Sequence, residues 1–83
     1  MTGEEARELE LLAMRAIMRT ENGRAFMYTC LQNCGTYTGT FSADTHEHAF
    51  RAGARSHGLW LDAELRDAAT DDYFRMLREQ VDV

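Results

Sequence analysis

Hydrophobic residues recur at helical spacing through the first half of the chain. Thr2-Gly3-Glu4-Glu5 has the spacing of a capping box, and apolar residues then return every three or four positions as far as Arg19. After turn residues at 20–23, apolar side chains stand at i, i+3, i+4 and i+7 from Met27 onward, and Gly35 follows them as a left-handed helix end. The pattern predicts two helices, over residues 3–19 and 23–34.

The second half carries the same spacing over a longer run. Asp44 and Glu47 form a second candidate capping box, and no proline interrupts the chain from there to Ala68. Thr70-Asp71-Asp72 is expected to cap a last helix, and residues 36–43, rich in threonine and glycine, to form a packed loop. These signals predict helices over 45–68 and 71–81, the first of them about 35 Å long.

The length of the chain limits it to one domain. Eighty-three residues, 45% of them hydrophobic and 28% charged, are typical of a small globular protein rather than a disordered segment. The predicted fold is all-α, a single helical domain over residues 1–83 in which about four helices form a small bundle around a long central third helix.

The predicted helices carry more apolar surface than so small a bundle needs. On the first helix one stripe, expected in the core, comprises Ala6, Leu9, Leu12, Ala13, Ala16 and Ile17. A second stripe lies nearly opposite. On the third helix the face of Phe50 and Leu61 is expected to be buried, and further apolar residues lie away from it. The predicted partner-binding residues are therefore Leu11, Met14, Met18, Leu59 and Trp60. The alternative is that the long helix runs through the middle of the bundle and hides Trp60 within its own chain.

Charge narrows the class of partner. Fourteen carboxylates oppose nine arginines, without any lysine, and give a net charge of −5; residues 59–83 hold seven of the carboxylates against three arginines. Nucleic acid is an unfavourable partner for such a surface, so the expected partner is a protein. No apolar run reaches the length of a membrane span, and the start of the chain is acidic where a signal peptide would be basic, so no membrane partner is expected.

The cysteines and histidines offer the one candidate metal site. Cys30 and Cys34 lie one helical turn apart and could bind zinc together with two of His46, His48 and His57. They fall on the face predicted to be core, however, and paired zinc cysteines usually stand in a tight turn. We expect two buried free thiols, and neither a metal nor a cofactor.

Other polar and small residues of the third helix have structural interpretations. His57 is expected to be a core histidine bonded to a loop carbonyl, Gly53 to allow close helix packing, and Gly58 to relieve crowding by the loop 36–43. The stripe of Arg51, Arg55 and Arg66 is expected to be solvated and paired within the helix, because Glu47 and Asp62 precede two of these arginines by four residues. No catalytic constellation is recognised, so the sequence does not predict an enzyme.

A family resemblance spans roughly residues 15–79. It is carried by the order and spacing of Thr20, Gly23, Arg24, Leu31, Cys34, Gly35, Phe41, Phe50, Gly53, Arg55, Gly58, Leu59, Tyr73, Met76 and Leu77. In these the chain resembles a small protein family of tailed phages, first named from a Bordetella phage. It departs from the pattern at Ala54 and His57, where an arginine and a branched aliphatic residue are expected, so a shared arginine contact is in doubt.

The resemblance implies a non-enzymatic virion structural protein, present in the host cytoplasm during assembly. The implied partners are the portal, the head-to-tail region or the internal ejection and tail proteins, contacted by many copies in a symmetric assembly. Two alternatives stay open: a small regulatory adaptor that binds a host protein or DNA, and a small zinc or redox protein based on the cysteines and histidines.

Overall fold

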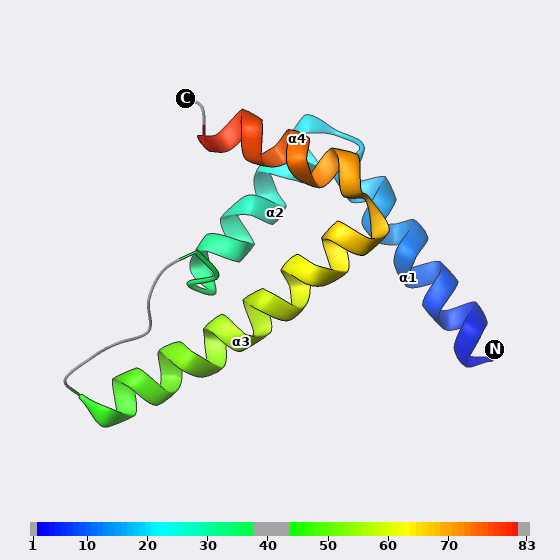
Figure 1. Ribbon diagram of the computed structural model, residues 1–83. Coiled ribbons are helices and arrows are strands. Elements are labelled where there is room, and N and C mark those ends of the chain that lie inside the picture. The colour runs from blue at the N-terminus through cyan, green and yellow to red at the C-terminus, as the bar shows by residue number, and fades with distance from the viewer. Residues whose placement is uncertain (1, 38–43, 82–83) are drawn as a thin grey trace.

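The computed structural model describes residues 2–37 and 44–81, and they form four helices in the order expected (Figure 1). Their bounds are α1 Gly3–Met18, α2 Glu21–Asn33, α3 Thr45–Ala68 and α4 Thr70–Val81. The all-α class and the long third helix are confirmed, and no strand occurs in the described residues. The part of the predicted loop that covers residues 38–43 lies outside the described residues.

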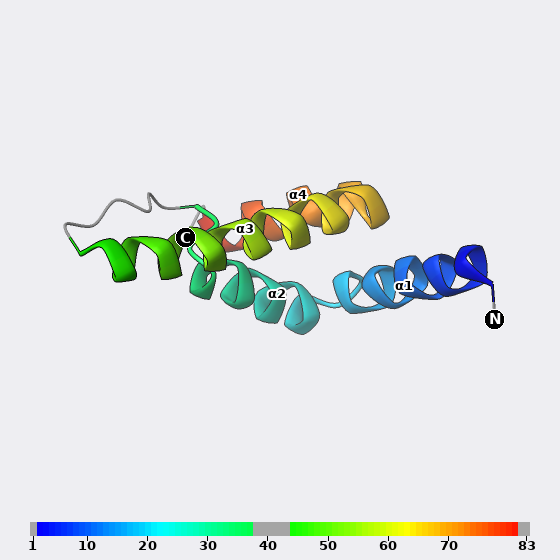
Figure 2. The ribbon, with the colours of Figure 1, turned by 90° about the horizontal axis from the view of Figure 1, so that it is seen from below.

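The helices form two layers, with α1 and α2 in one and α3 and α4 in the other (Figure 2). In the face-on view α1 and α3 diverge, so that the first turns of each project away from the other helices (Figure 1). The molecule measures 43 × 38 × 16 Å, and its radius of gyration of 14.5 Å exceeds the about 12 Å of a compact domain of this length. The predicted small helical bundle is therefore confirmed, and it is flat and open.

Local capping explains where three helices begin. The side-chain oxygens of Thr2, Thr20 and Asp44 accept from the backbone N–H three residues on, at 3.2, 3.0 and 2.8 Å. Because Thr20 is the cap, α2 starts at Glu21, two residues earlier than predicted. At the other end of α2, Gly35 has φ 71°, as expected for a left-handed helix end.

The boundary between α3 and α4 differs from the prediction. Thr70 does not cap α4 but is its first residue, and its hydroxyl donates back to the Arg66 carbonyl of α3 at 2.6 Å. The break is confined to Ala69 (φ −148°, ψ 67°). This break leaves carbonyl groups at the end of α3 without partners in the helix. Arg15 of α1 donates from Nε to one of them, the carbonyl oxygen of Ala68, at 2.7 Å.

The hydrophobic core is small and draws on all four helices. Its fully buried side chains are Met18, Leu31, Leu65, Tyr73 and Met76. Met14, Met27, Tyr28, Leu61, Ala69 and Leu77 pack against them as partly buried residues. A core of this size holds the helices together only where they cross.

The face that α1 buries is the opposite of the one predicted. Met18 is fully buried and Met14 packs beside it, whereas Leu9, Leu12 and Ile17 of the expected core stripe are exposed, Leu12 at 56%. The two stripes have similar apolar character, so the helical period alone did not decide which of them faces the other helices. Met18 is therefore a core residue of its own chain and not part of a docking surface.

A buried arginine joins three helices. The side chain of Arg24, on α2, is 2% exposed, and its Nη1 donates to the carbonyls of Met18 and Arg19 at the end of α1, each at 3.0 Å. Its Nε and Nη2 donate to the two carboxylate oxygens of Glu79 on α4, at 2.6 and 3.0 Å. The guanidinium fork thereby closes one helix end and anchors another helix with four hydrogen bonds.

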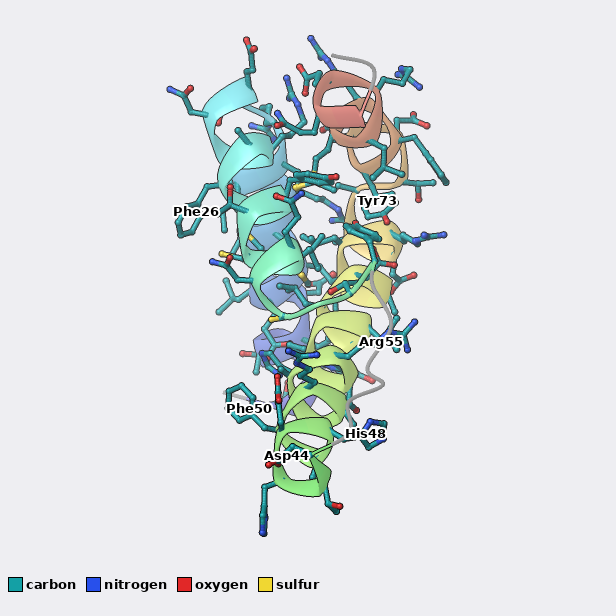
Figure 3. The ribbon with its side chains drawn as sticks, turned by 90° about the vertical axis from the view of Figure 1, so that its left-hand side faces the viewer. Phe26, Asp44, His48, Phe50, Arg55 and Tyr73 are labelled. Carbon is teal, nitrogen blue, oxygen red and sulfur yellow. The ribbon has the colours of Figure 1, made fainter. Side chains whose placement is uncertain are left out.

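The first half of α3 leaves the core, which overturns three expectations. Phe50 is 76% exposed rather than buried, and it projects to the same side of the molecule as Phe26 of α2 (Figure 3). His57 is exposed and stacks on Trp60 with ring centroids 5.3 Å apart, instead of lying in the core. Gly53 has open space where a Cβ would stand, so no described residue packs closely against it.

Gly58, in contrast, is a point of close approach. A Cβ at this position would overlap the Thr36 hydroxyl and would stand 2.7 Å from Cys34 Cβ. The turn after α2 therefore lies directly against the backbone of α3. This confirms the prediction that Gly58 relieves crowding at this point.

The two glycines of α3 provide a matched pair of substitutions. Gly58→Ala should lower the free energy of unfolding by about 1–3 kcal/mol, because the new methyl group must displace Thr36 and Cys34. Gly53→Ala should raise it by roughly 0.5–1 kcal/mol, since alanine favours an exposed helix interior. Urea unfolding of both variants measures these two changes. Equal changes in the free energy of unfolding would contradict the close contact of Gly58 with Thr36 and Cys34.

Glu79→Gln tests the buried arginine. The hydrogen bonds from Arg24 lower the pKa of Glu79 below 4.5 in the folded protein. The carboxylate of Glu79 therefore stabilises the folded state fully at pH values above its pKa in the unfolded chain. This stabilisation is lost as the pH falls through its lower pKa in the folded protein. In urea titrations from about pH 3 to pH 7, the glutamine variant should be less stable at neutral pH and should lose less stability in acid.

The matched control is Glu47→Gln, which removes a carboxylate from an exposed pair with Arg51 within α3. At neutral pH it should lower the free energy of unfolding by less than Glu79→Gln does. An acid slope of Glu79→Gln equal to that of the wild type would contradict the role assigned to Arg24.

Candidate interaction surface

A mostly apolar groove opens between α1 and α3. It has a volume of about 390 Å³, and its apolar lining consists of Ala13, Met14, Ile17, Met27, Trp60 and Leu61. α2 contributes only Met27, while the other lining residues stand on the two diverging helices. We call this feature the α1–α3 groove.

Helical periodicity explains why these side chains meet. On α1 the lining residues Glu10, Ala13, Met14 and Ile17 stand at i, i+3, i+4 and i+7, and so share one face. On α3 the residues Trp60 and Leu61 precede Glu64 by four and three positions, so the three also share one face. Each wall of the groove is therefore a helix face of the kind that packs against another helix.

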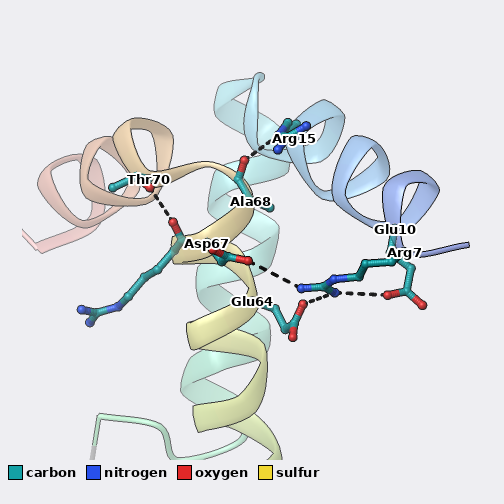
Figure 4. A network of polar contacts seen from close by, with 8 residues as sticks. Arg7, Glu10, Arg15, Glu64, Asp67, Ala68 and Thr70 are labelled. Carbon is teal, nitrogen blue, oxygen red and sulfur yellow. Dashed lines mark hydrogen bonds and ion pairs between the residues drawn. The ribbon is translucent and has the colours of Figure 1, made fainter. Parts of the chain in front are cut away.

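Carboxylates border the groove. Glu10 and Glu64 complete its lining, one on each wall. Arg7 of α1 joins the two: its Nη1 lies 3.2 Å from Glu10 and also donates to Glu64, while its Nη2 lies 3.7 Å from Asp67 (Figure 4). One arginine thus faces three carboxylates, and the hydrogen bonds to Glu64 and Glu10 raise the pKa of Arg7.

The structure places the predicted partner-binding residues in different environments. Trp60, 55% exposed, and Met14, partly buried, line the same groove. Leu59 is exposed outside the groove lining, and Leu11 is partly buried on α1. Met18 is in the core, as described above.

Sequence reasoning missed Ile17 and Ala13 as groove residues because it placed them in the core stripe. Their exposure depends on the rotation of α1 about its axis, and that rotation follows from the burial of Met18 and the contacts of Arg24. The sequence of α1 did contain a signal for an exposed apolar surface. Two apolar stripes on one helix indicate that one stripe faces outward, but they do not identify it.

A second polar feature lies on the other side of α3. Asp62 is buried, and its Oδ1 accepts from Tyr73 Oη and, at 3.2 Å, from Tyr37 Oη. Arg66 donates from Nε to Asp62 Oδ2 at 2.9 Å and from Nη2 to Tyr73 Oη at 3.1 Å. The Arg66 guanidinium also lies 4.6 Å from the centre of the Tyr73 ring.

This cluster connects the turn after α2 to both α3 and α4. Tyr37 stacks on Tyr28 with ring centroids 5.7 Å apart, which places its hydroxyl over Asp62. Burial, followed by hydrogen bonding within the cluster, raises the pKa of Tyr37 and Tyr73 above 10.0. Every side chain of the cluster has its partner inside the cluster, so it stabilises the fold.

The charged stripe of α3 pairs within the helix. Arg51 pairs with Glu47 and Arg66 with Asp62, both at i, i+4 as expected. Asp62 was expected at the solvated surface, however, and its burial below Tyr37 and Tyr73 is a consequence of the tertiary structure.

The thiols of Cys30 and Cys34 are free but only half-buried, which corrects the expectation of fully buried thiols. Across residues 2–37 and 44–81, no three His, Cys, Asp or Glu side chains come together in a group that could hold a metal ion. Within the same residues no helix is both long enough and apolar enough to span a bilayer.

Comparison with known proteins gives one match. Residues 14–78, more than three quarters of the chain, match the family described as Bbp19-like phage protein. No curated protein and no solved structure matches the chain significantly.

The polar cluster around Asp62 predicts a pH dependence. Folding raises the pKa of Tyr37 and Tyr73, so their contribution to the free energy of unfolding is complete below their pKa of 10.0 in the unfolded chain. It is lost as the pH rises through the higher pKa values of the folded protein. Tyrosinate absorbance of these two residues should therefore appear above pH 10.0, together with loss of helical circular dichroism.

Tyr73→Phe should lower the free energy of unfolding at neutral pH by roughly 1–3 kcal/mol, since Asp62 loses a buried donor. Tyr28→Phe is the control, because it keeps the ring that stacks on Tyr37. Equal stability of the two variants would show that the bond to Asp62 contributes little.

Proposed function

The chain belongs to the family of Bbp19-like phage proteins, and we propose that it is a non-enzymatic structural protein of the virion. In this proposal it docks to a larger virion assembly at the portal, the head-to-tail region or the internal ejection proteins. The observation that carries the proposal is apolar surface left uncovered on a phage protein whose own core is small.

The overall shape supports a docked protein. The accessible surface is 5801 Å², whereas a compact chain of 9.5 kDa exposes about 5,000 Å². A flat chain with diverging helices gains stability when another protein covers its open side.

The exposed residues support the same proposal. Leu9, Leu12, Phe50 and Trp60 are each more than half exposed. Large exposed apolar side chains are typical of interaction surfaces. The net charge of −5 favours a protein partner over DNA, which opposes the alternative of a DNA-binding regulator.

Quantitative mass spectrometry of purified particles tests the proposal. We expect the chain at a fixed number of copies relative to the portal protein, retained after washing at high salt. Its presence in infected cells but absence from particles would contradict the structural role and favour a regulator.

A further inference from the structure

We propose that the α1–α3 groove binds a basic amphipathic helix of the larger virion protein to which this chain docks. This inference rests on the proposed function and adds to it the site and the chemistry of the partner. It is carried by the shape of the groove walls and by the charge of its border.

The walls fit a helix. Glu10, Ala13 and Ile17 present one face of α1, and Trp60 and Glu64 present the matching face of α3. An added helix between them would pack against both, as the third member of a three-helix arrangement. The stretch from Glu10 to Ile17 rises about 10 Å, which corresponds to two turns of the occupant.

The lining fits apolar anchor residues on that helix. Trp60 and Ile17 are exposed at 55% and 41%, so an occupant would remove a large apolar area from water. Met14 and Met27 also line the groove, and their unbranched thioether side chains adapt to the shape of inserted residues.

The border requires positive charge on the occupant. Glu10 and Glu64 line the groove, Asp67 lies one turn beyond Glu64, and Arg7 neutralises only one of these three carboxylates. Lysine or arginine on the flanks of an inserted helix would pair with these groups.

A second copy of the chain fits the groove less well. Each copy carries a net charge of −5, so pairing two copies at an acidic border brings like charges together. The basic helix is therefore the occupant that the charges favour.

Trp60 is the only tryptophan of the chain, so its fluorescence reports on the groove. The probe is an amphipathic model peptide of leucine and lysine, compared with its leucine and glutamate counterpart. We expect the lysine peptide to shift the Trp60 emission to the blue and the glutamate peptide to leave it unchanged. Equal response to both peptides, or to neither, would overturn the inference.

Two substitutions separate the apolar and the charged contributions. Ile17→Asp places a charge in the groove and should weaken binding of the lysine peptide at least about tenfold. Glu10→Lys, at a residue with an exposed side chain, should weaken it roughly as much by charge repulsion. Phe26→Asp is the matched control, because Phe26 is exposed at 65% but lies on α2 outside the groove lining.

Circular dichroism checks that each variant is folded. If Ile17→Asp fails to fold, Ala13→Asp replaces it, since Ala13 is an exposed groove residue. Loss of binding in Phe26→Asp together with the groove variants would show that the peptide does not select the groove.

Incorporation into particles distinguishes the two proposals. If the wild-type chain is present in virions and Ile17→Asp or its replacement is lost while Phe26→Asp is retained, both proposals stand. If all variants are incorporated equally, the chain is a virion protein but the groove inference is wrong. If the wild type is absent from virions, the proposed function fails, while the peptide titration still tests the groove.

Discussion

The bidentate pair between Arg24 and Glu79 fixes how the helices of this protein meet. The same guanidinium closes the carbonyl end of α1, so one buried side chain sets the angle between α1 and α2 and places α4 across them. A buried arginine is stable only when its polar atoms have partners, and here four hydrogen bonds give each of the three side-chain nitrogens at least one. Moving α1 or α4 would leave this charge without partners, which makes the arrangement specific as well as stable.

The open shape follows from that junction. Five fully buried side chains hold the four helices near their crossing point, and Arg15 adds one bond to the end of α3. The helix segments beyond the crossing have no described partner that covers their apolar faces, which is why Phe50 is exposed and why α1 and α3 enclose a groove instead of packing together. The proposed docking role uses the surface that so small a core leaves uncovered.

The residues behind the family resemblance mostly serve the architecture. Thr20 caps α2, Gly35 adopts the left-handed conformation that ends it, and Gly58 lets the following turn rest on α3. Tyr73 and Met76 are core residues of α4. The groove residues Ile17 and Trp60 are not among them, so the resemblance identifies the scaffold, whereas the docking proposal depends on surface that this scaffold leaves open.

The sequence by itself determined the four helices, most of their caps and the i, i+4 ion pairs of α3, because these depend on residues within one or two turns of each other. It also indicated surplus apolar surface on α1. Only the tertiary structure decided which stripe is buried, because Met18 and Leu12 are equally suited to a core and the choice follows from the long-range contacts of Arg24. The tertiary structure also decided the burial of Asp62, whose carboxylate is covered by Tyr73 of α4 and by Tyr37 of the turn after α2. These three residues lie far apart in the sequence, so no local pattern predicts their contact.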